Sequence, residues 1–189
     1  GVSWRRPREV PMSEALLLID IQNDYFPGGA YEVPGSTAAA QAAARLLAAF
    51  RGGRGPVVHV QHHAVRPGST FFLPGTPGAE IHALVQPQGA EPVVTKHFPN
   101  SFRETDLLDT LRKLGVTRLV VAGMMTHMCI DATVRAANDL GFACKVAADA
   151  CAAPGQALGG IAVPPEHVHA AFLAALSGSY AEVVSASEA

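Results

Sequence analysis

The stretch TRLVVAGMMTHMCIDATVRAANDLGFACKVA, residues 117–147, contains the pattern that decides the fold. It begins with an apolar run (Thr117–Ala122), continues with a helical pattern closed by a glycine (Thr126–Leu140), and returns to an apolar run (Phe142–Ala147). A short, continuous apolar run is typical of a strand that is buried on both faces. The stretch therefore predicts two parallel strands joined by a crossover helix.

The rest of the chain repeats this alternation. Further strands are predicted at Ala15–Ile19, Pro56–Gln61, Pro92–Thr95 and Ala181–Val184, and further helices at Ser36–Phe50, Arg103–Leu114 and Glu166–Leu176. Such alternation predicts an α/β fold, in which a mainly parallel sheet of about six strands carries helices on both faces. We expect one domain over residues 13–189. Residues 1–12 lack the apolar segment of a secretory signal, and we interpret them as a flexible arm or a non-native remnant.

Composition excludes several classes of protein. The chain has 189 residues with 14 Lys+Arg against 16 Asp+Glu, so no excess of positive charge favours nucleic-acid binding. The hydrophobic fraction of 49% argues against disorder, and no apolar run is long enough to span a membrane. Three cysteines without zinc-type spacing favour a reducing compartment. We expect a cytoplasmic protein that binds a small-molecule substrate, and neither nucleic acid nor a membrane.

Three reactive side chains directly follow predicted strands. Asp20 ends the first strand, Lys96 follows the third, and Cys129 lies in the first turn of the helix after the fourth. Taken singly, each has an ordinary explanation, as a turn cap, a solvated lysine or a small core residue. In an open parallel sheet, however, ligands bind beyond the carboxyl ends of the strands. The joint placement of the three residues therefore predicts an active site there.

The three residue types suit nucleophilic catalysis by a thiol. With Thr126 as the N-cap, Cys129 occupies the third helical position, where the partial positive charge of a helix N-terminus is expected to lower its pKa. Asp20 can accept the thiol proton as a general base. Lys96 adds a positive charge that favours both the thiolate and the carboxylate.

Three segments of the chain also carry a family resemblance: LLLIDIQNDYFPGG (Leu16–Gly29), KHFPNSF (Lys96–Phe102) and VVAGMMTHMCIDATVRAA (Val120–Ala137). Together and in this order they resemble the isochorismatase-like cysteine hydrolase superfamily, which includes nicotinamidases and several amidohydrolases. The resemblance covers the chain from about residue 15 to its end. It implies a Rossmann-like three-layer α/β/α sandwich that assembles as a dimer or tetramer.

The resemblance also implies a role for each site residue. Asp20 is the proton acceptor, Lys96 its charge partner and Cys129 the nucleophile that attacks an amide carbonyl and forms a thioester. The backbone N–H groups of Met125 and Cys129 form the oxyanion hole, and a cis peptide bond joins Met124 to Met125.

Two features favour particular subfamilies. Isochorismatases proper, which cleave a vinyl ether, commonly lack the nucleophilic cysteine, so Cys129 favours hydrolysis of a C–N bond. Nicotinamidases hold a metal on an Asp-x-His pair after the second strand, where this chain has Gln61, His62 and His63. Adjacent side chains on an extended chain face opposite sides, so the two histidines do not converge on one ion. We therefore expect neither a metal nor another cofactor.

The substrate pocket is predicted less specifically. Gln22 and five aromatic residues close to the catalytic positions are candidates for substrate binding: Tyr25, Phe26, Phe72, Phe98 and Phe102. A long Pro- and Gly-rich excursion, Gln61–Glu91, is the expected source of specificity.

The sequence favours a cysteine-dependent hydrolase of a small amide or related C–N bond. An ether hydrolase of the isochorismatase type and a nicotinamidase remain alternatives, as does a non-catalytic oligomeric binding protein on the same scaffold. A redox role for Cys129 is a further possibility, although no resolving cysteine is close in sequence.

Overall fold

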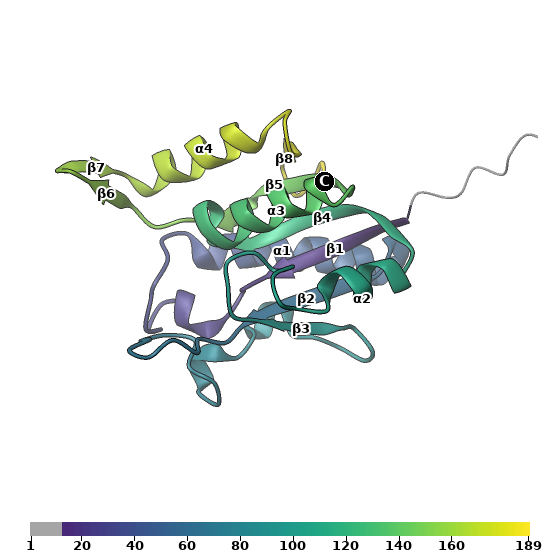
Figure 1. Cartoon of the computed structure of the whole chain (residues 1–189), viewed down its shortest axis with the longest axis horizontal. Coiled ribbons are helices and arrows are strands. Elements are labelled where there is room, and N and C mark those ends of the chain that lie inside the picture. The colour runs from purple at the N-terminus through teal and green to yellow at the C-terminus, as the bar shows by residue number, and fades with distance from the viewer. Residues whose placement is uncertain (1–12) are drawn as a thin grey trace, which may run out of the picture.

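The computed structural model describes residues 13–189, so the prediction for residues 1–12 lies outside the described part of the chain. At its centre, six strands pair in parallel in the order β3-β2-β1-β4-β5-β8 (Figure 1). The strands are β1 (Ser13–Ile19), β2 (Val57–His62), β3 (Val93–Lys96), β4 (Val116–Met124), β5 (Ala143–Ala152) and β8 (Glu182–Val184). All six correspond to predicted strands, and the predicted α/β class is confirmed.

The strand order places a switch point between β1 and β4. From β1 the chain moves outward through β2 to β3, then returns to the other side of β1 with β4 and moves outward again through β5 to β8. The loops that leave β1 and β4 therefore diverge and open a crevice at the carboxyl ends of these strands, which is where open α/β sheets bind ligands.

Helices cover both faces of the sheet, so the fold has three layers. The helices are α1 (Ser36–Ala49), α2 (Leu107–Lys113), α3 (Asp131–Asp139) and α4 (Pro165–Leu176). Leu16 and Leu18 of β1 share one buried cluster with α1, whereas Leu17 and Ile19 share another with α2, α3 and α4. Successive side chains of a strand point to opposite faces, so one continuous apolar run supplies both cores. No helix within residues 13–189 is long and apolar enough to cross a membrane.

Short helical turns complete the regular structure, and two predicted helices differ from observation. These turns are Asn23–Tyr25, Phe50–Arg54, Pro77–Ala79, Ala83–Val85 and Thr126–Ile130. The helix predicted from Arg103 begins only at Leu107, because the hydroxyl of Thr105 donates to the carbonyl of Ser101 and accepts the N–H of Leu107. The helix predicted at Thr126–Leu140 is a wide turn followed by α3.

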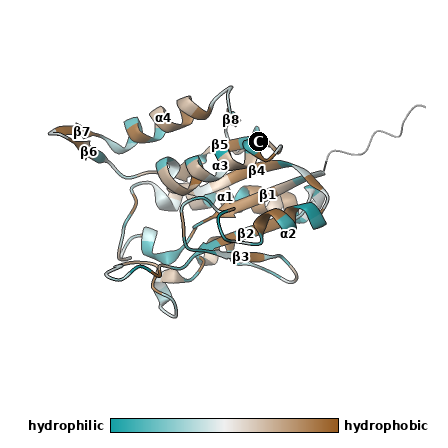
Figure 2. Cartoon of the chain, in the orientation of Figure 1, coloured by the Kyte–Doolittle hydropathy of each residue, from teal (hydrophilic) through white to brown (hydrophobic). Residues whose placement is uncertain are grey.

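The sequence analysis missed a hairpin between β5 and α4. It consists of antiparallel β6 (Gln156–Leu158) and β7 (Ile161–Val163), joined by Gly159 and Gly160, both with positive φ. Glycine accepts these angles without strain, which suits a two-residue turn. The hairpin projects from the body, and Leu158 and Ile161 are 84% and 69% exposed (Figures 1 and 2). The Gly-Gly pair between apolar residues was the available signal.

Candidate active site

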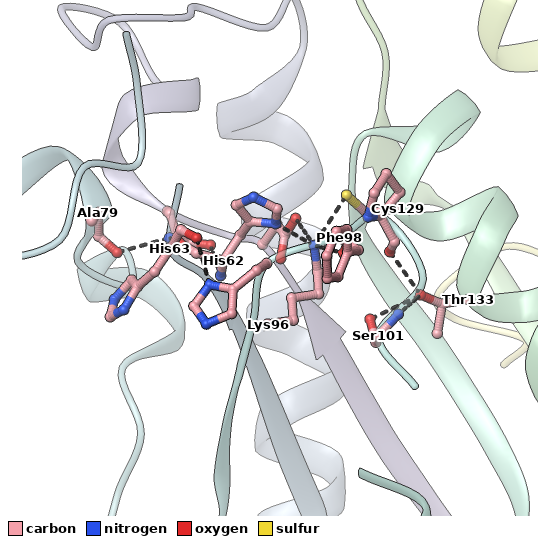
Figure 3. A network of polar contacts seen from close by, with 12 residues as sticks. His62, His63, Ala79, Lys96, Phe98, Ser101, Cys129 and Thr133 are labelled. Carbon is pink, nitrogen blue, oxygen red and sulfur yellow. Dashed lines mark hydrogen bonds and ion pairs between the residues drawn. The ribbon is translucent and has the colours of Figure 1, made fainter. Parts of the chain in front are cut away.

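The carboxyl ends of β1, β3 and β4 bring the three predicted catalytic residues together; Figure 3 shows Lys96 and Cys129 of this cluster. The Nζ atom of Lys96 lies 3.0 Å from Oδ2 of Asp20 and 3.3 Å from Sγ of Cys129. Asp20 and Lys96 have no solvent-exposed surface, and Cys129 is 5% exposed. The placement rule for parallel sheets thus correctly predicted that side chains far apart in sequence would meet.

Asp20 occupies a tightly constrained position at the end of β1. Its backbone N–H donates to Val60 of β2 (3.0 Å), and its φ of 52° is in the left-handed region. On the other side, Ile19 is in register with Gly123 of β4, where a Cβ atom would lie 1.9 Å from the Ile19 carbonyl oxygen. Only glycine permits this approach of β4, and non-glycine residues adopt positive φ chiefly where the surrounding structure imposes it.

Lys96 is the hub of the polar cluster. Besides Asp20 and Cys129, its Nζ atom contacts Nδ1 of His62 (2.7 Å) and the carbonyl oxygen of Phe98 (3.0 Å). Burial acts to lower the pKa of Lys96, but the negative charge of Asp20 and the contacts of the ammonium group with Asp20 and Cys129 raise it above its ordinary value. The side chain is therefore a protonated ammonium, whose three N–H groups donate to His62, Phe98 and Cys129 while its charge pairs with Asp20.

His62, at the end of β2, is a neutral acceptor in this cluster. Burial and then the charge of Lys96 lower its pKa to about 4. Because the Lys96 ammonium can only donate, Nδ1 of His62 carries the lone pair and Nε2 the proton. From the sequence, His62 was considered as a metal ligand and not as a partner of Lys96, because its contact with Lys96 depends on the register between β2 and β3.

One set of side chains has ligand atoms close enough to hold a metal ion. Ligand atoms of Asp20, His62 and Cys129 lie within 4.8 Å of one another. The ammonium group of Lys96, however, contacts all three. Its positive charge occupies the position among these donors that a cation would need, so the residues present do not fit a metal, and no catalytic step is assigned to one.

Cys129 lies in a wide turn between β4 and α3. The carbonyl of Met125 accepts the N–H groups of both Met128 and Ile130, and the five-residue spacing of the second bond is characteristic of π-type turns. Thr126 does not act as the expected N-cap, because its hydroxyl hydrogen-bonds Nδ1 of His169 on α4 (2.8 Å). The predicted third helical position of Cys129 is therefore wrong.

The predicted lowering of the thiol pKa is wrong as well. Burial raises the pKa of Cys129 well above its ordinary value, the negative charge of Asp20 raises it further, and Lys96 only partly opposes both. The thiol is consequently neutral in the resting protein. Attack by sulfur then requires a base at the moment of reaction, and Oδ1 of Asp20 has no hydrogen-bond partner within residues 13–189.

The turn begins directly after Met125 and contains Cys129, the two residues whose N–H groups the resemblance assigns to an oxyanion hole. The Met125 carbonyl bonds the N–H groups of Met128 and Ile130, and the N–H of Cys129 between them takes part in neither bond. The peptide bond from Met124 to Met125 is cis. Met125 and Cys129 both line the cavity described next.

A cavity of about 400 Å³ opens above the cluster. It is lined by Asp20, Tyr25, His62, residues 64–66 and 68–72, residues 97–99, Met125, Met128 and Cys129. Three predicted substrate-binding residues, Tyr25, Phe72 and Phe98, are among them. The volume suits a small organic substrate rather than a polymer.

The structure corrects the prediction for Gln22, Phe26 and Phe102, which do not line this cavity. Gln22 is fully buried, where it accepts the N–H of His62 and donates to the carbonyl oxygens of His62 and Ala79, so it fixes the loop after β2.

The two aromatic residues pack elsewhere. Phe26 stacks on His82 with ring centroids 4.0 Å apart, and Phe102 stacks on Phe142 at 6.1 Å. Closeness in sequence to the catalytic residues did not decide the direction of these side chains.

Beyond the predicted residues, the cavity wall is formed mainly by residues 64–66 and 68–71, which belong to the Gln61–Glu91 excursion expected to set specificity, although Arg66 was not singled out within it. Met128, in the Thr126–Ile130 turn, was not predicted to line the cavity. The Pro-Gly pair at Pro67 and Gly68 marked a turn, but only the folded structure shows which neighbouring side chains face the site.

Comparison with known proteins defines the class to which this fold and site belong. The family model of the isochorismatase domain matches residues 14–188. The chain is 53% identical over 172 residues to the isochorismatase family protein YddQ of Bacillus subtilis, covering 91% of this chain and 96% of YddQ. A crystal structure of an isochorismatase-type protein from Oleispira antarctica shares 52% identity with a TM-score of 0.91, covering 94% and 96% of the two chains.

The chain therefore belongs to the isochorismatase family and is a hydrolase of the isochorismatase-like class. Among its relatives, a maleamate amidohydrolase of Pseudomonas putida is 36% identical over 142 residues, covering 68% of this chain and 67% of that protein.

Proposed function

We propose that this chain is a cysteine-dependent hydrolase of a small amide or related C–N bond, acting through an acyl-thioester intermediate. The observation that carries the proposal is the contact between the Lys96 ammonium and both Asp20 and Cys129 at the floor of a small cavity. A nucleophile, a base and a fixed positive charge are the groups that thiol-dependent acyl transfer needs.

The first half of the reaction forms the thioester. As Cys129 Sγ bonds to the amide carbon, its proton moves to the free carboxylate oxygen of Asp20. Lys96 stabilises the charge that develops on sulfur, and the N–H groups of Met125 and Cys129 donate to the carbonyl oxygen as it becomes an anion. Collapse of this intermediate breaks the C–N bond, and the proton on Asp20 passes to the leaving nitrogen, which departs as ammonia or an amine.

The second half regenerates the enzyme. Asp20, again a carboxylate, takes a proton from a water molecule as its oxygen attacks the thioester carbon. The C–S bond then breaks, the acid product forms, and the proton returns from Asp20 to Cys129. Lys96 keeps its proton throughout, in line with its raised pKa.

The names of relatives support a C–N bond as the target. They include the maleamate amidohydrolase and a nicotinamidase of Escherichia coli that is 30% identical over 174 residues, covering 72% of this chain and 82% of that enzyme. The segment Gln61, His62 and His63 at the end of β2, which lacks an Asp-x-His pair, argues against a nicotinamidase that depends on a metal held there.

Ammonia release from a panel of small amides, including nicotinamide, tests the proposal. We expect release from at least one amide, and intact-mass spectrometry of a rapidly quenched reaction should detect an acyl adduct on Cys129. Asp20→Asn, which keeps the shape of the side chain, should abolish adduct formation. The proposal would be contradicted if no amide released ammonia and none formed an adduct. Hydrolysis of a vinyl ether instead would favour the isochorismatase alternative.

We also propose that the protein is a cytoplasmic homo-oligomer, a dimer or a tetramer. The exposed apolar residues Leu158 and Ile161 on the projecting hairpin are consistent with a surface covered in an assembly. Analytical ultracentrifugation distinguishes a monomer, which would contradict the proposal, from the two assemblies.

A further inference from the structure

We propose that the substrate carries a carboxylate and that Arg66 binds it at the cavity mouth. This inference rests on the proposed function in one respect, namely that the reacting amide lies at Cys129. It adds the chemical class of the substrate: a half-amide of a small dicarboxylic acid, or a similar amide with a second, anionic end.

Arg66 is presented by an ordered loop. The loop is closed at its base by the Ala64 N–H, which donates to the Phe72 carbonyl (2.9 Å), and the Phe72 N–H donates in turn to the Asp24 carboxylate (2.7 Å). At its tip, the N–H and the hydroxyl of Ser69 both donate to the Arg66 carbonyl, at 3.2 and 2.8 Å.

The conformation of this tip follows from its sequence. Pro67 and Gly68 occupy the two central positions of the turn, and Gly68 has a φ of 83°. Proline followed by a glycine with positive φ is the pattern of a type II turn. Arg66 therefore starts from a backbone that is fixed at both ends, which reduces the entropy lost when its side chain binds a ligand.

The charges around the cavity leave Arg66 unbalanced. Asp20 is the one carboxylate among the lining residues, and it is already paired with Lys96 beneath it. His62 is neutral above pH 4. Within residues 13–189, none of the ion pairs includes Arg66, whereas Arg51 forms one with Glu91. The cavity therefore has a net positive charge at Arg66, which attracts an anion.

The position and chemistry of Arg66 select the kind of anion. A guanidinium group presents paired N–H donors in one plane, which match the two oxygens of a carboxylate. The same cavity is also lined by Tyr25, Phe71 and Phe72, which suit a short uncharged carbon chain, and Arg66 itself is exposed. An amide at one end and a carboxylate at the other fit a cavity that combines the catalytic cluster, apolar walls and the positive charge of Arg66.

Two amides of equal length test the inference. Succinamate and butyramide differ in having a carboxylate or a methyl group at the end remote from the amide. We expect kcat/KM for succinamate to exceed that for butyramide by about 10- to 100-fold, as a charged hydrogen-bonded pair provides. Arg66→Gln should bring the ratio of the two kcat/KM values close to 1, and Arg66→Lys should retain part of the preference for succinamate. The ratio should fall with added salt.

A matched control comes from another exposed arginine. Arg112 lies on α2 and does not line the cavity, so Arg112→Gln should leave the ratio unchanged. A wild-type enzyme without preference for succinamate over butyramide would overturn the inference. So would an Arg66→Gln variant that lowers both kcat/KM values equally, because that pattern indicates a structural role.

Binding to the inactive Cys129→Ala protein separates this inference from the proposed function. Titration calorimetry with succinamate and the longer glutaramate should show binding that Arg66→Gln weakens by at least about 10-fold. Such binding without hydrolysis by the wild-type protein would overturn the proposed function and retain the anion site. Hydrolysis of both test amides without preference would retain the proposed function and overturn the anion site. If the protein showed no binding and no hydrolysis, both hypotheses would be overturned.

Discussion

Two ion pairs in this protein have similar geometry and opposite surroundings. Lys96 and Asp20 lie 3.0 Å apart with no exposed side-chain surface, whereas Arg51 and Glu91 lie 2.7 Å apart with side chains that are 26% and 16% exposed. Burying two charges costs several kcal/mol, of which their attraction recovers only part, and an exposed pair contributes about 0–1 kcal/mol.

The difference shows that the distance between two charged groups does not reveal what the ion pair contributes to the protein. Burial of a lysine against a carboxylate, a thiol and a neutral imidazole costs folding free energy, so stability alone does not explain the cluster. The Arg51–Glu91 pair joins the turn after α1 to the loop before β3 and touches no group of the catalytic cluster. We therefore interpret the buried cluster as catalytic and the surface pair as structural, and four predictions test this contrast.

The largest effect is expected from the nucleophile. Cys129→Ala should lower kcat by at least about 10⁴-fold, since no other group in the cluster can form the thioester. Cys144→Ala, which truncates a buried cysteine in β5 remote from the cavity, should leave kcat unchanged. Steady-state ammonia release measures both. Substantial turnover by Cys129→Ala would exclude nucleophilic catalysis by this thiol.

Removal of one buried charge should be the next largest effect. Lys96→Met leaves the Asp20 carboxylate buried without its cation, and we expect a loss of about 3–5 kcal/mol in the free energy of unfolding. Lys96→Met combined with Asp20→Asn removes both charges and should recover much of this loss without recovering activity. Urea unfolding measures the stabilities. A double variant as unstable as Lys96→Met would contradict the electrostatic explanation.

The pH dependence of stability should show the same buried cluster. The pKa of His62 is about 4 in the folded protein against an ordinary 6.5, so between these pH values the unfolded chain binds a proton that the folded chain does not. Stability attributable to His62 is therefore present above pH 6.5 and falls as pH drops toward 4, by up to about 1.4 kcal/mol per pH unit.

Comparison with a variant isolates this contribution. His62→Gln should lose less stability than wild type between pH 7 and pH 5, as measured by urea unfolding at each pH. His59→Gln is a suitable second variant, because burial also lowers the pKa of His59 although it lies outside the cluster and contacts Glu91 instead. An equal slope in wild type and His62→Gln would contradict the placement of His62 against Lys96.

Sequence reasoning predicted that the three candidate catalytic residues would meet, because their positions follow from the sheet. Continuous apolar runs define parallel strands, and residues at the ends of such strands converge whatever lies between them. This rule brought Asp20, Lys96 and Cys129 together across more than a hundred residues. It required no knowledge of side-chain direction.

What sequence reasoning could not supply was environment. The thiol pKa was predicted from the helix N-terminus, but the folded chain buries Cys129 beside the Asp20 carboxylate, and both the burial and this negative charge raise the thiol pKa. Gln22 and Phe102 were assigned to the pocket from their proximity in sequence, whereas hydrogen bonding and stacking turn them elsewhere. These outcomes depend on long-range packing that no local pattern encodes.

The smallest effect is expected at the surface pair. The hydrogen bond from Arg51 is the main cause that lowers the pKa of Glu91 to about 2; burial opposes it, and the hydrogen bond with His59 adds to it. This pair therefore stabilises the fold above pH 4.5 and loses its contribution as pH falls toward 2, a window below that of His62. Arg51→Gln should cost at most about 1 kcal/mol at pH 7, less in 1 M salt, and should leave kcat unchanged. A loss of stability comparable to that of Lys96→Met, or any loss of turnover, would contradict the interpretation of the Arg51–Glu91 pair as a weak structural contact.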